Sequence, residues 1–305
     1  MGHHHSHHKH NNLNDKKLLG VTILNLSITI VQVIGGILSS SLSLLSDALH
    51  NLGDSSAIFI AFYAGKKSKQ SPNEHRTYGY KRIEILAALF NAMVLIGICF
   101  FLFFEAYERF INPKPVHGKI MFIVASFGLL ANFISVLILN KNKNHNLNVK
   151  AAYLHLLGDT FSSVAVIVGG IFIWRYQIYW IDPIITVFVG VYIIYHTWGI
   201  VKQTVDILMQ STPNQINIRK IKNTVEQVPE VDNIHHLHVW QLNDTQIHLE
   251  AHINLKNDMS ISQMMLIRKV ISNTIKMNYK IQHITLQMGY GCCPKHNELI
   301  YNKNN

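Results

Sequence analysis

The sequence has 305 residues, of which 49% are hydrophobic and only 14% are charged. Soluble globular domains carry about 25% charged residues, so this composition excludes an ordinary soluble protein and indicates a membrane protein. The formal net charge is +10, but the basic residues lie mostly between hydrophobic runs. In that position they determine membrane topology, so the charge does not predict a nucleic-acid partner.

The chain begins with a histidine-rich segment, in which residues 3–10 contain six histidines. Such a tract is typical of flexible metal binding, and an expression tag is the alternative. The interruptions at Ser6 and Lys9 favour a natural tract. The segment has no apolar core of a signal peptide. We therefore expect residues 1–15 to form a His-rich cytoplasmic tail.

Six apolar segments follow the tail, each close to the roughly 20 residues that cross a bilayer core. They span residues 18–38, 42–65, 83–104, 120–139, 151–174 and 181–201. We expect them to form a six-helix transmembrane domain over residues 16–212. Lys and Arg are more frequent in the segments that lie inside when the N-terminus is inside. This bias predicts a multi-pass protein of the cell membrane with both termini in the cytoplasm.

Two of these segments carry the same pair, a histidine and an aspartate four residues apart. The first copy has His50 and Asp54, and the second has His155 and Asp159. Residues four apart share one face of a helix. Two such helices side by side offer two imidazole nitrogens and two carboxylates, a tetrahedral set that Zn²⁺ accepts. Ionisable groups inside a membrane are costly, so the repeated pair predicts a functional metal site.

The residue types also indicate what such a site does. Histidines with a reference pKa of about 6.5 exchange metal for protons near physiological pH, and metal binding displaces their protons. The sequence therefore predicts Zn²⁺ export coupled to proton entry. Asp47 precedes His50 by about one helical turn. It is expected either to orient the imidazole of His50 or to lie hydrated near the outer interface.

The composition changes after Pro213. The pattern predicts a helix over 214–228, strands over 233–242 and 246–255, a helix over 260–278 and a strand over 281–288. This order favours an α+β ferredoxin-like domain over residues 213–291, followed by a tail over 292–305. The whole fold expected is an α-helical membrane protein with six transmembrane helices and this C-terminal cytoplasmic domain.

The chain resembles the cation diffusion facilitator family in its zinc-transporter branch. The resemblance is carried by Ser46–Asp54, Tyr78–Ala88, His155–Asp159 and His236–Trp240. It implies a homodimeric Zn²⁺/H⁺ antiporter that exports metal across a lipid bilayer, with His50, Asp54, His155 and Asp159 as the transport site. Histidine at both first positions resembles the zinc-preferring members, which often also accept cadmium or cobalt.

The resemblance also implies a regulatory Zn²⁺ site in the cytoplasmic domain. The matching positions are His235, His248 and His283, with Cys292 and Cys293 near the tail. His235 and His248 fall on adjacent predicted strands and are expected to face each other; exposed strand histidines are the alternative. Gly289 stands where some members have an acidic residue. The loop site that other members carry is not expected, because its positions here hold Asn73, Arg76 and Tyr80.

Two other functions are weighed. An intramembrane metalloenzyme needs a glutamate general base beside its ligands, as in His-Glu-x-x-His, and neither pair has one. A catalytic zinc also keeps one coordination position open, whereas two pairs fill all four. A membrane-anchored metal sensor leaves the costly intramembrane pairs without a role. The sequence therefore predicts a transporter and not an enzyme.

Overall fold

The computed structural model describes residues 12–140 and 147–291. Within these, the side chains of residues 12–22, 58, 139 and 147–156 are not described. The chain divides into two compact units. The first comprises residues up to 62 and residues 90–200, and the second comprises residues 63–89 and the chain from 201 onwards.

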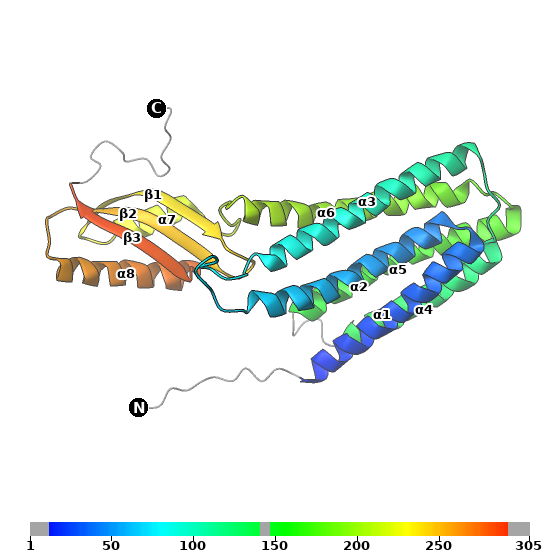
Figure 1. The fold of residues 1–305 in the computed structure, drawn as a ribbon, viewed down its shortest axis with the longest axis horizontal. Coiled ribbons are helices and arrows are strands. Elements are labelled where there is room, and N and C mark those ends of the chain that lie inside the picture. The colour runs from blue at the N-terminus through cyan, green and yellow to red at the C-terminus, as the bar shows by residue number, and fades with distance from the viewer. Residues whose placement is uncertain (1–11, 141–146, 292–305) are drawn as a thin grey trace. The chain divides into compact units, whose positions relative to one another are not determined.

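Six long helices form the N-terminal two thirds of the described chain, in the places that the apolar segments predict (Figure 1). They are α1 (Asn12–Ser39), α2 (Leu42–Ser68), α3 (Ile83–Ile111), α4 (Gly118–Asn140), α5 (Leu147–Tyr176) and α6 (Ile181–Leu208). A tight turn with Ser40 at a positive φ of 55° separates α1 from α2. Their surfaces expose many large apolar side chains, among them Phe59, Phe62 and Phe188. Such surfaces belong in lipid or against a partner.

Four of the helices are long and apolar enough to span a membrane in their described residues: α3, α4, α5 and α6. In α1 the described apolar stretch is shorter, Ile23–Ser39. Polar residues lower the hydropathy of α2, which contains Asp47, His50, Asn51 and Asp54. The residues of the predicted site are therefore the reason that α2 is less apolar than the other helices.

An apolar core joins α2, α4 and α5 around Leu44, Met121 and Val166. A second small core joins α3 to α6 through Cys99 and Ile193. Both cores consist of apolar side chains from different helices. They fix the face that each helix turns toward its neighbours.

A buried carboxylate also links α6 to the start of α2. Asp182 is fully buried and accepts hydrogen bonds from the Leu42 backbone N–H at 2.7 Å and the Ser41 hydroxyl at 2.6 Å. The bond from Leu42, together with one of 3.1 Å from the Ser43 backbone N–H, satisfies backbone donors that the start of a helix leaves unpaired. A carboxylate at a helix N-terminus is also favoured by the helix dipole.

The C-terminal domain follows the predicted element order. Its elements are α7 (Ile218–Glu226), β1 (Val231–Gln241), β2 (Ile247–Leu255), α8 (Ile261–Tyr279) and β3 (His283–Tyr290). The sheet order is β1-β2-β3, with β1 antiparallel and β3 parallel to β2. A full ferredoxin-like fold has one more strand before the first helix. Here the described chain begins the domain with α7, and β3 pairs directly with β2.

One apolar core holds this domain together. Side chains from α7 and α8, including Ile221 and Ile271, pack with Ile234, Leu249 and Ile253 of the strands. Helix α7 begins four residues later than predicted, because Asn217 is its N-cap and accepts from two backbone N–H groups. Ser260 and Gln263 form a capping box at the start of α8.

Candidate metal centre

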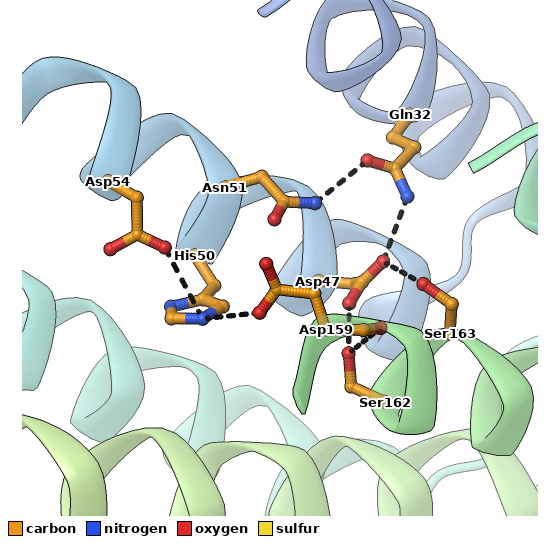
Figure 2. A network of polar contacts seen from close by, with 8 residues as sticks. All are labelled: Gln32, Asp47, His50, Asn51, Asp54, Asp159, Ser162 and Ser163. Carbon is orange, nitrogen blue, oxygen red and sulfur yellow. Dashed lines mark hydrogen bonds and ion pairs between the residues drawn. The ribbon is translucent and has the colours of Figure 1, made fainter. Parts of the chain in front are cut away.

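The structure brings together three of the four residues of the repeated pairs. His50 Nε2 lies 3.4 Å from Asp54 Oδ2 on the same helix and 3.4 Å from Asp159 Oδ1 on α5. Figure 2 shows the ring of His50 between the two carboxylates. Asp159 is 2% exposed, and His50 is 11% exposed. The predicted meeting of α2 and α5 is therefore present in the described side chains.

The fourth residue, His155, lies in α5 one helical turn before Asp159, but its side chain is outside the described part of the structure. Among the described side chains, no group of three or more His, Cys, Asp or Glu has the full geometry of a metal site. The three side chains at His50 thus form a partial site, and the predicted four-ligand set stays a prediction.

Asp47 is buried beside these residues and connects three helices. It is 1% exposed, so the alternative of a hydrated carboxylate is wrong. Its carboxylate accepts hydrogen bonds from Gln32 Nε2 of α1 at 2.8 Å and from the Ser162 hydroxyl of α5 at 2.7 Å (Figure 2). Ser163 contributes a longer bond of 3.4 Å. Asp47 therefore ties α2 to both α1 and α5.

The amide of Gln32 extends this network. It also accepts a hydrogen bond of 3.1 Å from Asn51 Nδ2, so one amide connects Asp47 with Asn51 on consecutive turns of α2. Gln32 lies against Gly128 of α4, where an added Cβ would collide with its amide nitrogen. A glycine at 128 therefore leaves the room that the network needs.

The glycine of the second pair has a comparable role. An added Cβ on Gly158 would collide with the hydroxyl of Tyr192 on α6. Gly158 directly precedes Asp159, so the lack of a side chain lets α6 approach the helix that carries this carboxylate. Close approach of helices at small residues is the usual packing mode in membranes.

In the cytoplasmic domain, the sheet register separates the predicted histidines into two groups. His235 pairs with His252 on β2, whereas His248 pairs with Trp240 on β1 and His283 on β3. The expectation that His235 and His248 face each other is therefore wrong. The hairpin pairing of β1 with β2 sets His248 opposite Trp240, and a separate shift in register between His235 and His238, with His236 at φ 48°, leaves His235 opposite His252. The alternation of polar and apolar residues along a strand does not reveal such a bulge.

Each group brings imidazole rings close together. The ring centroids of His248 and His283 are 4.7 Å apart, and Trp240 stacks on His248 at 5.4 Å. In the other group, the centroids of His236 and His252 are 4.8 Å apart, and those of His235 and His252 are 5.5 Å apart. Cys292 and Cys293 lie outside the described residues.

Burial lowers the pKa of His248, and the nearby His283 lowers it further. Both causes disfavour the imidazolium form. The neutral form that results is the form that binds metal ions.

Family models match almost the whole chain. The cation efflux transmembrane domain matches residues 18–209, and the cation efflux protein cytoplasmic domain matches residues 213–289. The chain belongs to the cation diffusion facilitator, or cation efflux, family. The transmembrane model includes both α1 and α2, so all six helices belong to the membrane domain. Members of this family are transporters and not enzymes.

Curated relatives support this membership over the full length. The chain is 38% identical to the zinc transporter ZitB of Pectobacterium atrosepticum, over 96% of this chain and 90% of that protein. It is 34% identical to the metal cation efflux system protein CzcD of Cupriavidus metallidurans, over 96% and 92% of the two chains. It is also 34% identical to the cadmium, cobalt and zinc/H⁺-K⁺ antiporter of Bacillus subtilis, over 92% and 91%.

Sequence reasoning marked Gln32 only as a polar residue that faces other helices, and it did not identify Asp182. Each is a single polar residue next to or within an apolar segment, and its partners lie on other helices. The sequence does indicate that each of these residues needs a hydrogen-bond partner, because burial of an unpaired polar group is costly. The sequence gives no indication of which helix supplies that partner.

Proposed function

We propose that this cation efflux protein exports Zn²⁺ from the cytoplasm in exchange for protons, through a site of His50, Asp54, His155 and Asp159. The observation that carries the proposal is the placement of the His50 imidazole between carboxylates from two helices. The printed names of the relatives, which include zinc transporters and an antiporter that uses protons, support the same function. Cadmium and cobalt are the expected secondary substrates.

The separations between the side chains support a tetrahedral cation. Zn²⁺ binds imidazole nitrogen at about 2.0–2.1 Å and carboxylate oxygen at about 2.0–2.2 Å. Two ligands at those lengths on one tetrahedral ion lie about 3.4 Å apart, from the same bond lengths. His50 Nε2 lies 3.4 Å from an oxygen of each carboxylate. These two spacings fit two edges of a zinc tetrahedron, and His155 would supply the fourth ligand.

The charges of the site support exchange of metal for protons. Two carboxylates neutralise the divalent cation, which lowers the cost of holding it among apolar helices. Each imidazole binds metal only when neutral, so protons that arrive from the other side compete with Zn²⁺ for the same nitrogen atoms. A site with two histidines therefore couples release of metal to uptake of protons.

The chain is a multi-pass membrane protein, and we further propose that both termini lie in the cytoplasm. The excess of Lys and Arg in the segments that would lie inside supports this orientation. The family model that matches the cytoplasmic domain is named for dimer formation, which supports association of two copies. We propose that the protein works as a homodimer that associates through this domain.

Zinc regulation through the cytoplasmic domain is a second part of the proposal. His248 and His283 lie side by side on β2 and β3, while His235 lies near His236 and His252. Zinc bound at these rings would favour one arrangement of the dimer. The double substitution of His248 and His283 by Ala should then remove the zinc dependence of transport. Unchanged dependence in that variant would contradict the regulatory part alone.

The transport proposal is tested by zinc flux into proteoliposomes that carry a pH gradient. Wild-type protein should move Zn²⁺ with opposite movement of protons. Asp159→Asn should reduce the flux by more than about 100-fold, because removal of one charged ligand costs several kcal/mol of cation binding. Asp206→Asn, which changes an acid at the end of α6, should retain flux.

Two results would contradict this proposal. Near-normal flux in Asp159→Asn would remove the carboxylate from the transport route. Absence of zinc flux in wild-type vesicles, together with zinc binding to the cytoplasmic domain, would instead favour a membrane-anchored metal sensor.

A further inference from the structure

The last turn of α2 and the loop that joins it to α3 are strongly basic. Residues 66–82 contain a single acid, Glu74, and a set of basic residues: Lys66, Lys67, Lys69, Arg76, Lys81 and Arg82. A turn closes at Asn73 and Arg76, whose backbone groups exchange hydrogen bonds of 3.0 and 3.2 Å. Gly79 has a positive φ of 70° and donates to the Arg76 carbonyl at 2.8 Å. These hydrogen bonds give the backbone of the loop a defined shape.

Two of these cations converge on one aromatic ring. The guanidinium of Arg76 lies 4.4 Å from the centroid of Tyr80, and the ammonium of Lys67 lies 4.7 Å from it. Each contact is favourable by about 0.5–1 kcal/mol at an exposed site. The two like charges nevertheless repel each other, and an anion beside them would relieve that repulsion.

Arg82 shows the same need for a partner. In the described part of the chain its Nε is buried and has no hydrogen-bond partner. A buried donor without an acceptor costs about 1–3 kcal/mol, more when it carries charge. The acid nearest to Arg82 in the sequence, Glu84, accepts a hydrogen bond from the Ser68 hydroxyl instead.

Arg76, Tyr80 and Arg82 line one pocket of about 520 Å³. Its lining includes Arg76, Lys81 and Arg82 together with Tyr80 and Trp240, and no acidic residue. A water molecule occupies about 30 Å³ of liquid, so the pocket has room for a phosphate group and its substituents. Guanidinium groups bind phosphate through two parallel hydrogen bonds. The pocket is therefore suited to a phosphate anion and unsuited to a metal cation.

The position of the pocket in the chain indicates the source of the phosphate. Ile83 and Leu86 also line it, and Ile83 is the first residue of the apolar span of α3. Leu86 is 52% exposed. The basic pocket therefore adjoins the start of an apolar helix, as expected at the level where a bilayer passes from headgroups to acyl chains. Tyr and Trp rings are enriched at that level.

We propose that this pocket binds the phosphate of an anionic phospholipid, with the acyl chains along the start of α3. With the orientation proposed above, the lipid belongs to the inner leaflet, where juxtamembrane basic residues are attracted to anionic headgroups. Arg82 and Arg76 hold the phosphate, and Lys81 adds positive charge.

The test measures thermal unfolding of the purified full-length chain in neutral detergent, with short-chain phosphatidylglycerol, short-chain phosphatidylcholine or inorganic phosphate added. Phosphatidylglycerol should raise the melting temperature of the wild type at concentrations where the other two have no effect. Arg82→Gln and Arg76→Gln should each weaken the apparent affinity for phosphatidylglycerol about fivefold, the effect of one basic residue near a membrane surface. Arg82→Lys should lie between Arg82→Gln and the wild type.

Lys220→Gln is the matched control, because Lys220 is an exposed cation of α7 outside the pocket. It should respond to phosphatidylglycerol as the wild type does. An equal response of Arg76→Gln and Arg82→Gln to that of the wild type would overturn the site. A response to inorganic phosphate that matches the response to phosphatidylglycerol would overturn the lipid as its ligand. If Arg82→Gln does not fold, Arg76→Gln alone decides between these outcomes.

Discussion

The intramembrane site and the cytoplasmic domain place their histidines by different means. Around His50, hydrogen bonds between buried polar side chains connect α1, α2 and α5, and Asp47 is at their centre. In the cytoplasmic domain, apolar side chains such as Leu249 and Ile271 form a continuous core, and the histidines lie on strands whose pairing decides their neighbours.

The two regions should therefore be sensitive to different kinds of substitution. Lipid is as apolar as the side chains between membrane helices, so polar contacts and close packing specify how these helices associate. In water, burial of apolar surface stabilises the cytoplasmic domain, and polar groups mainly select the register. Three experiments test this contrast, in order of decreasing expected change in stability.

Of the three changes, Leu249→Ala should have the largest effect, a loss of stability of the cytoplasmic domain. Leu249 lies fully buried in the centre of the sheet, and truncation of such a side chain costs about 2–5 kcal/mol. In thermal unfolding of the full-length protein, the circular-dichroism signal of the sheet should be lost at a lower temperature than in the wild type. Ile261→Ala, an exposed position at the start of α8, should change little. An equal effect of the two substitutions would contradict the assignment of the core.

Gly128→Ala should weaken the polar network between the membrane helices. The added methyl group would push the Gln32 amide away from Asp47, and loss of a hydrogen bond to a charged group costs about 1.5–3 kcal/mol. Gly97→Ala is the control, because nothing lies within 4 Å of a Cβ added there. The melting temperature and zinc flux of Gly128→Ala should fall relative to Gly97→Ala. Matching values would show that the network tolerates displacement of Gln32.

Acidification should destabilise the cytoplasmic domain by a smaller amount. The pKa of His248 is lowered by burial and by His283, so the unfolded chain binds its proton more readily than the folded chain. The contribution of His248 is complete above the unfolded pKa of about 6.5 and declines as pH falls below that value. With a chelator present, unfolding between pH 7.5 and pH 5.5 should depend less on pH in His248→Gln. Substitution of the exposed His238 should leave the dependence unchanged.

The helices of the membrane domain were predictable from the sequence, because an apolar segment of about 20 residues crosses a bilayer as a helix, which pairs all its backbone polar groups. The pairs His50–Asp54 and His155–Asp159 were predictable within each helix, since a spacing of four fixes a shared face. The domain order after Pro213 was also predictable, because strand and helix periods differ clearly. The resemblance of the motifs to a known family then gave the expected chemistry.

The neighbours of these residues were decided by tertiary structure alone. The sequence did not show that Asp47 meets Gln32 and Ser162, because three helices must pack before those side chains meet. Nor did it show that His248 pairs with His283 rather than with His235, because the pairing of β2 with its two neighbouring strands decides which histidines are adjacent. Local spacing determines which face a residue occupies, whereas its contacts depend on elements distant in the chain, whose packing and register no local pattern encodes.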